Sequence, residues 1–540
     1  MSVRAARLLL VLACATSLSA CSTYTGDTPL PPLGEPVSVP YDGPWTPLEE
    51  KGEWVDPGPL AECSVLSSTT ASCGTESSFD LSRCDGASLA GLEREGAIYR
   101  AEIRYEFPMS TGGVNVAPDN GGFQLDAAGQ PLSVMGQPAS LSRVDTGTFI
   151  VSSQRAVTGN TTDRITFAGC KATGPRTLTG CMATCRNGQL RYRATFRAER
   201  MTWREGESES SGLQRISESH VDRGVPVDVY VTKGHAYVVS APRQGRPGGL
   251  TVFDVRDARN PVQRVSLDRP NDSYWNGVWA KDDALYIASG AAGVLVYDIT
   301  DPANPAFVRR ANVPGIAGTL NVHTVFVEGS RLYAMAPSIR ETLIFDITRP
   351  LEPQLLMGYA YPNGLGYPHD AFAYGGRLYI NHTENGFLAV DVTGTTPTLL
   401  GKYTYGYSYS HANAVGTFNG RTVAFEGGET LGAHLRVLDV TNPAGIAKVG
   451  EYKLRGLTSI HNMVLVGTRL YVAYYHEGVR VLDVADPTQP REVAYFNTFR
   501  ESDAARADGL YEGAIGMRVP GDGHIYVVDT SRGLLLFDEP

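Results

Sequence analysis

The sequence predicts an all-β protein, a seven-bladed β-propeller with four-stranded blades, preceded by a small cysteine-rich antiparallel β domain. Two observations predict this division. An apolar run ending in Asp returns seven times, and all eight cysteines lie before the first of these runs, six of them between residues 63 and 185. Consecutive aspartates are 44, 48, 45, 48, 44 and 55 residues apart, which is the length of one four-stranded blade. The aspartates are Asp254, Asp298, Asp346, Asp391, Asp439, Asp483 and Asp538.

Residues 1–20 are predicted to be a lipoprotein signal peptide. Arg4 and Arg7 precede an apolar run over residues 8–15 that is too short to span a bilayer. The run is followed by Leu18-Ser19-Ala20-Cys21, which resembles the lipobox of bacterial lipoproteins. That resemblance implies that Cys21 becomes the lipidated first residue of the mature chain. The alternative is a cleaved secretory signal with an incidental cysteine.

The expected location is therefore the cell envelope, with the chain held at a membrane by its lipid. Ser22 stands where retention signals of the inner membrane often carry aspartate, so the outer membrane is favoured and the leaflet stays open. Residues 21–59 are expected to form a tether. Their proline content favours an extended, semi-rigid spacer over packed structure. The prolines are Pro29, Pro31, Pro32, Pro36, Pro40, Pro44, Pro47, Pro57 and Pro59.

Residues 60–205 are predicted to be the cysteine-rich β domain. Strand-like runs occur over residues 97–107, 148–153 and 190–203, with glycine-rich turns between them. An even number of cysteines in an exported module suggests up to three disulfides, and six cysteines allow fifteen pairings. Zinc is the competing interpretation for Cys181 and Cys185, although no second pair of matching spacing accompanies them. The cysteines are Cys63, Cys73, Cys84, Cys170, Cys181 and Cys185.

Residues 206–540 are predicted to form the propeller. Its third strands carry apolar residues on both sides, as in Val294-Leu295-Val296-Tyr297, which suits a sheet covered on both faces by neighbouring blades. The Asp that ends each run is expected to accept hydrogen bonds from backbone N–H groups in the next turn. The last repeat stops after three strands, so residues 213–217 are predicted to supply the missing strand and close the ring.

Two phrases of the chain, LYIASGAAGVLVYDITDPANP and LYVAYYHEGVRVLDVADPTQP, resemble LVIVD repeats. These are bacterial, mostly surface-associated propeller repeats. The resemblance covers roughly residues 212 to 540 and is strongest in the second and sixth blades. It implies an LVIVD-type propeller and no particular reaction, because the family is defined by residues that form the fold.

Composition excludes some functions. The formal net charge is −10 and no basic stripe is present, which argues against a nucleic-acid partner. The sequence also lacks a phosphate-binding loop, a dinucleotide fingerprint, a GxSxG nucleophile elbow, an HExxH zinc motif and an EF-hand loop.

One candidate site remains, at the mouth of the central channel. Aligning the repeats places a polar side chain at the start of the innermost strand in five consecutive blades, and the turns between second and third strands add further groups. Imidazoles and carboxylates that converge there suit a divalent transition metal or acid–base chemistry. The structural alternative is that each imidazole bonds the neighbouring blade and locks the ring. The candidates are Asn276, His323, His369, His411, His461, His382, Glu426 and His476, with Glu384, Glu429, Glu477 and Asp529 in the same turns.

Three functional hypotheses follow. The first is a non-enzymatic, membrane-anchored lipoprotein whose propeller is a rigid platform for protein or glycan partners. The second is a metal-dependent oxidoreductase or hydrolase that uses the histidine rim, with a divalent metal as its cofactor. The third assigns recognition to the cysteine-rich domain, whose loops over residues 108–122 are long and polar.

Overall fold

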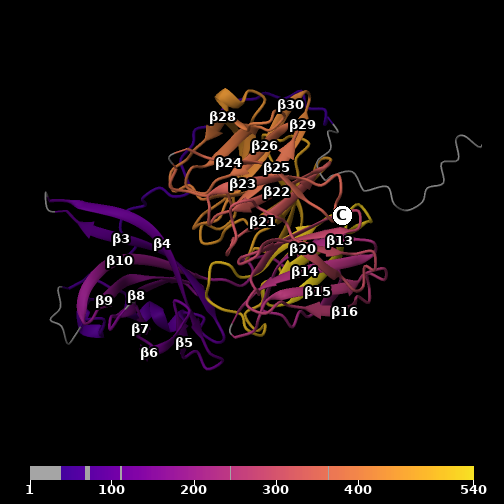
Figure 1. Cartoon of the computed structure of the whole chain (residues 1–540). Coiled ribbons are helices and arrows are strands. Elements are labelled where there is room, and N and C mark those ends of the chain that lie inside the picture. The colour runs from indigo at the N-terminus through magenta and orange to yellow at the C-terminus, as the bar shows by residue number, and fades with distance from the viewer. Residues whose placement is uncertain (1–37, 67–72, 110–111, 158, 244, 363) are drawn as a thin grey trace, which may run out of the picture.

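The computed structural model describes residues 38–66, 73–109, 112–157, 159–243, 245–362 and 364–540. The predicted signal peptide and Cys21 lie outside these residues. The described chain forms a small cysteine-rich barrel and a seven-bladed propeller that lie side by side, with the barrel in indigo and purple (Figure 1). No helix in these ranges is long and apolar enough to cross a membrane.

The cysteine-rich domain is a closed eight-stranded antiparallel barrel. Each strand pairs with the next in the chain, and β10 returns to β3 and closes the sheet. The strands are β3 (Ile98–Pro108), β4 (Val114–Leu125), β5 (Pro131–Val134), β6 (Gln137–Val144), β7 (Phe149–Ala156), β8 (Thr162–Gly174), β9 (Thr177–Arg186) and β10 (Gln189–Arg200). Alternate side chains point inward, and the rings of Tyr99, Phe123, Phe149, Phe167 and Phe196 fill the interior.

Three disulfides join the segment before the barrel to its outer surface. They are Cys63–Cys181, Cys73–Cys185 and Cys84–Cys170, so the disulfide prediction is confirmed. The segment itself contains β1 (Ser64–Val65), η1 (Glu76–Ser78), β2 (Phe79–Asp80) and η2 (Gly86–Gly91).

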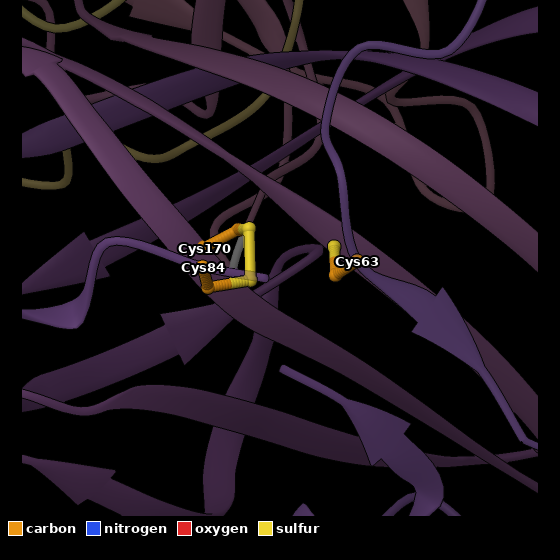
Figure 2. Close-up of side chains that lie close together, drawn as sticks. All are labelled: Cys63, Cys84 and Cys170. Carbon is orange, nitrogen blue, oxygen red and sulfur yellow. A yellow bond between two sulfur atoms is a disulfide. The ribbon is translucent and has the colours of Figure 1, made fainter. Parts of the chain in front are cut away.

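The zinc interpretation of the cysteines is wrong. Sulfur atoms of Cys63, Cys84 and Cys170 do lie close enough together to hold an ion. Figure 2 shows, however, that Cys84 and Cys170 are bonded to each other. Cys63 is bonded to Cys181. No thiolate is left among the six to bind a metal.

The propeller has seven blades of four antiparallel strands, ordered from the axis outward as they occur in the chain. Blade 1 contains β13 (Val225–Thr232), β14 (His235–Ala241), β15 (Gly249–Asp254) and β16 (Val262–Leu267). Blade 2 contains β17 (Trp275–Lys281), β18 (Ala284–Ser289), β19 (Gly293–Asp298) and β20 (Ala306–Arg310). Blade 3 contains β21 (Thr324–Glu328), β22 (Arg331–Ala336), β23 (Glu341–Asp346) and β24 (Gln354–Ala360).

The later blades repeat this pattern. Blade 4 contains β25 (Asp370–Tyr374), β26 (Arg377–Asn381), β27 (Phe387–Asp391) and β28 (Thr398–Tyr403). Blade 5 contains β29 (Ser410–Phe418), β30 (Arg421–Gly428), β31 (Leu435–Asp439) and β32 (Ala447–Tyr452), with the short turn η3 (Pro443–Gly445) between the last two. Blade 6 contains β33 (Asn462–Val466), β34 (Arg469–Ala473), β35 (Val479–Asp483) and β36 (Arg491–Phe496).

The seventh blade is completed by an N-terminal strand, as predicted. It contains β37 (Ala514–Arg518), β38 (His524–Asp529) and β39 (Gly533–Asp538), and β12 (Arg215–Ser219) pairs with the outer edge of β39. A second short strand, β11 (Ser210–Ser211), adds a fifth strand to blade 6 by pairing with β36. The innermost strands β37 and β13 contact each other, which closes the ring.

Local chemistry explains why the repeats form blades. In blade 2 the third strand β19 is buried over residues 293–297, whereas every residue of the outermost strand β20 is exposed. The carboxylate at the end of the third strand accepts a hydrogen bond from the N–H two residues later in blades 1 to 6, so the predicted turn role is confirmed there. In blade 7 Asp538 instead lies near the His524 ring.

Residues 39–53 lie along blade 5, and Trp54 and Asp56 contact β3 of the barrel, whereas an extended, semi-rigid spacer was expected of this proline-rich segment. Val39 pairs with Phe418 beside the blade, and Glu53 is 3% exposed. The carboxylate of Glu53 accepts a 2.6 Å hydrogen bond from the buried Arg436 and lies 2.8 Å from His434 Nδ1. The prolines keep the backbone of this segment extended. The ion pair between Glu53 and Arg436 holds the segment on the propeller, because a buried guanidinium requires a carboxylate partner.

The barrel is joined to the propeller through ion pairs, hydrogen bonds and a small apolar cluster that includes Ile98, Met201 and Phe499. Glu501, in the loop before β37, pairs with Arg200 of β10 at 2.6 Å, and its carboxylate accepts a 2.8 Å hydrogen bond from the Ile98 N–H of β3. Arg100 of β3 also donates to the Asp508 carbonyl. The same loop therefore contacts the barrel and borders the channel mouth.

Candidate functional site

A cavity of about 670 Å³ occupies one end of the central channel. Its walls are the starts of the innermost strands and the turns that precede them. This is the position at which the sequence places the histidine rim, and the structure brings five of the predicted residues together there: Asn276, His323, His369, His411 and His461.

The five side chains form a continuous arc across blades 2 to 6. Asn276 Nδ2 lies 3.2 Å from His323 Nε2. From His323 the ring centroids are 4.2, 4.1 and 4.4 Å apart through His369 and His411 to His461. The arc follows from the fold, because each blade contributes the same position of its innermost strand and adjacent innermost strands pack side by side.

Two of the imidazoles bond the next blade, as the structural alternative predicted. His411 Nδ1 lies 3.1 Å from the His461 carbonyl of blade 6, and His461 Nδ1 lies 2.5 Å from the Ile515 carbonyl of blade 7. A carbonyl oxygen only accepts, so each Nδ1 carries the proton and donates. The neutral rings therefore present a bare Nε2 toward the cavity.

Glu429 lies opposite these rings. It follows β30, and its N–H donates to the Tyr409 carbonyl, which holds the residue at the start of blade 5. Its Oε2 is 3.5 Å from His411 Nε2 and 3.9 Å from His369 Nε2, and its Oε1 is 3.5 Å from His461 Nε2. Tyr475 donates a short hydrogen bond to Oε1.

Burial controls the protonation of this cluster. It lowers the pKa of His323 to about 4 and that of His461 to about 3, the latter against the opposing effect of the Ile515 carbonyl. Burial and then the neighbouring imidazoles hold the pKa of His369 and His411 well below the usual range. Burial raises the pKa of Glu429 to about 7, although the Tyr475 hydroxyl partly opposes this shift. The rings are neutral at pH 7.

Tyrosines form the outer wall of the cavity. The hydroxyls of Tyr367 and Tyr409 are 2.6 Å apart, and the Tyr475 ring packs 4.9 Å from His461. Tyr274 and Tyr511 stand at the mouth with 40% and 53% of their surface exposed. The mouth thus offers aromatic faces to solvent above a polar floor.

Charged groups line the inner part of the cavity. Asp228 lies 3.7 Å from Arg518, whose guanidinium packs 4.5 Å from the centre of the Trp279 ring. Burial raises the pKa of Asp370 to about 7.

Three predicted rim residues, His382, Glu426 and His476, are not among the residues that line the cavity. Glu426 lies within β30, the second strand of blade 5, which is one strand spacing, about 4.8 Å, farther from the axis than the innermost strand. His382 and His476 lie in the turns after β26 and β34, the second strands of blades 4 and 6. His382 Nδ1 instead lies 2.9 Å from Asn385 Nδ2 in the same turn, and Glu426 accepts hydrogen bonds from Tyr405 and Ser410. His476 packs against the Phe499 ring at 4.7 Å.

The aromatic wall was not predicted, although the repeat carries a signal for part of it. The cavity residues Tyr274, Tyr367 and Tyr409 each stand two positions before an arc residue, and Asn321 takes that place in blade 3. Aligning that position across the repeats would have found them. Tyr475 and Tyr511 enter from the turn after β34 and from the loop before β37, where the other blades offer no repeated tyrosine.

Comparison with known families gives a match for two of the blades. The LVIVD repeat matches residues 274–313 and 461–498, which are the second and sixth blades. No curated protein matches the sequence. Similar solved structures include the WD40 beta propeller domain of Doa1, with 10% identity, a TM-score of 0.46, and coverage of 61% of this chain and 98% of that chain. The beta-propeller domain of Myceliophteria thermophila Cps50 (Swd1) has 11% identity and a TM-score of 0.44, with coverage of 61% and 100%. The chain therefore carries LVIVD repeats, and they are blades of a seven-bladed propeller.

Proposed function

We propose that this protein is a lipid-anchored lipoprotein of the bacterial cell envelope, and that its propeller is a rigid binding platform for a protein or glycan partner. The partner enters the mouth of the central cavity. The observation that carries the proposal is this mouth, where the exposed rings of Tyr274 and Tyr511 surround a polar cavity of about 670 Å³. Binding sites combine apolar surface with a few convergent polar groups in this way.

The rigidity of the platform supports the assignment. Seven sheets pack into one ring, the N-terminal strand β12 closes it, and the histidine arc adds bonds between blades 5, 6 and 7. A rigid surface loses little conformational entropy when it binds, so a modest set of contacts suffices for affinity.

Binding is tested by removing the exposed rings. The double variant Tyr274→Ala/Tyr511→Ala is compared with wild type on a glycan array and on immobilised envelope proteins. We expect affinity to fall by about 30-fold, the effect of losing about 2 kcal/mol from a contact centre.

Tyr407→Ala is the matched control, because Tyr407 is also half exposed but lies outside the cavity against Trp54. The proposal is wrong if the double variant binds as tightly as wild type.

The anchor is tested independently of the ligand. Cells expressing the full chain are labelled with an alkyne fatty acid, and Cys21→Ala is compared with Cys14→Ala, which removes a cysteine inside the predicted signal. We expect the label to be lost, and the protein to leave the membrane fraction, in the Cys21 variant alone. Equal labelling of both variants would remove the lipoprotein assignment and leave the binding test unaffected.

A further inference from the structure

Hydrogen-bond acceptors face one another around Glu429. His411 Nε2 is bare because the opposite nitrogen donates to the His461 carbonyl, and the ring is 2% exposed with no hydrogen-bond partner for Nε2 among the described residues. The atom it faces is Glu429 Oε2, at 3.5 Å. Two lone pairs in a buried site repel each other unless a proton or a metal ion lies between them.

The distances from the Glu429 carboxylate to the two imidazole nitrogens fit a shared metal ion better than direct hydrogen bonds. An N–H donor would sit about 2.9 Å from a carboxylate oxygen. Ligand atoms about 2.0–2.1 Å from one tetrahedral ion lie about 3.4 Å from each other. The observed distances from Glu429 Oε2 to the two Nε2 atoms are 3.5 Å to His411 and 3.9 Å to His369. One donor atom from each of the three residues lies within 4.8 Å of the other two.

We propose that His369, His411 and Glu429 form a three-ligand site for a divalent transition metal at the floor of the cavity. The three residues come from the starts of blades 4 and 5 and the turn after β30. The site is a feature of this chain beyond the platform function, and it does not depend on the lipid anchor.

The two oxygens of Glu429 have separate roles. Oε1 accepts the Tyr475 hydrogen bond and lies 3.5 Å from His461, whereas Oε2 faces His369 and His411. Tyr475 is therefore a positioning residue that turns the free oxygen toward the metal. The His461 carbonyl acts in the same way on His411, because it fixes the tautomer that leaves Nε2 available.

The donor set defines the class of ion. Two neutral imidazoles and one carboxylate suit Zn²⁺, Fe²⁺, Co²⁺ or Ni²⁺ better than Ca²⁺ or Mg²⁺, which prefer all-oxygen sites. Three protein ligands leave at least one coordination position, and the ligands line the open cavity. A water or a donor atom of a ligand in the cavity would take that position.

The test uses the full mature chain with no histidine tag, after removal of metal by a chelator. Zn²⁺ is titrated in competition with a coloured chelator, and Co²⁺ serves as a second probe through its visible absorption. We expect one equivalent to bind. Glu429→Gln and His369→Gln should weaken binding by more than the roughly 10–100-fold that loss of an outer partner causes. Tyr475→Phe should fall within that range.

His382→Gln is the matched control, since His382 is another buried imidazole that lies outside the cavity. Circular dichroism and the melting temperature of each metal-free variant establish that it is folded, and the two glutamine variants keep the size of the side chain. The inference is overturned if folded wild type binds neither ion at one equivalent. It is equally overturned if both ligand variants bind as tightly as wild type, or if only the control variant loses binding.

Discussion

Single residues of this protein show how burial changes the role of a side chain. His476 was a candidate for the channel rim, yet it is 1% exposed and neither ring nitrogen has a hydrogen-bond partner among the described residues. Burial, and then the guanidinium groups of Arg100, Arg455 and Arg506, hold the pKa of His476 well below its usual range. The ring is therefore neutral in the folded state.

This shift predicts a pH dependence of stability. Below about pH 6.5 the unfolded chain binds a proton at His476 that the folded chain does not, so the free energy of unfolding decreases as the pH falls, by up to about 1.4 kcal/mol per pH unit for this group. His476→Asn should reduce the slope between pH 6.5 and 5 by that amount. Urea unfolding at several pH values measures it.

His220→Asn, which changes an exposed imidazole, is the control, and the pH dependence of its free energy of unfolding should equal that of the wild type. A slope that is the same in His476→Asn and wild type would show that the buried ring takes up its proton without unfolding. The cavity histidines contribute equally to the pH dependence of His476→Asn and of wild type, so their contribution cancels when the two slopes are subtracted.

Secondary-structure elements show how a repeated sequence becomes a closed ring. The sequence predicted the closing strand at residues 213–217, and β12 occupies Arg215–Ser219. Its position could be predicted because blade 7 lacks a fourth strand and an unpaired edge is unfavourable. The fifth strand of blade 6, β11, could not be predicted, since a two-residue strand has no pattern and depends on where the chain leaves the barrel.

Replacing residues 215–219 with an alternating Gly-Pro segment of equal length tests the closure. The change removes ladder donors along β39 and should lower the free energy of unfolding by about 3 kcal/mol, from several hydrogen bonds of about 1 kcal/mol each. Chemical denaturation followed by tryptophan fluorescence measures the change.

Replacing Ser210–Ser211 with Pro-Gly is the control, and it should cost less than about 1 kcal/mol because β11 only extends a complete blade. Equal effects of the two replacements would argue that the ring does not need β12.

The whole molecule consists of two units joined by ion pairs, hydrogen bonds and a small apolar cluster. Glu501 pairs with Arg200 and accepts from the Ile98 N–H, and its side chain is 8% exposed. Glu501→Ala leaves a mostly buried guanidinium and an N–H without this acceptor, and we expect the contact to weaken by about 2 kcal/mol or more. Small-angle scattering should then show a larger radius of gyration, and calorimetry should separate melting of the barrel from that of the propeller.

Glu93→Ala provides the comparison, because Glu93 pairs with the same Arg200 from within the barrel and is 44% exposed. Its loss should cost less than about 1 kcal/mol and leave the scattering profile unchanged. If Glu501→Ala also keeps the wild-type profile and thermogram, other contacts hold the two units together.

The sequence by itself determined the number of blades, the closing strand, the turn role of the repeated aspartates and the arc of histidines. These features are periodic, and a repeat converts a fixed position in the chain into a fixed position around the axis. Only the tertiary structure decided the disulfide pairing, the closure of the barrel and the approach of Glu429 to His369 and His411. Each of these depends on contacts between segments that are far apart in the chain, and no period in the sequence encodes such contacts.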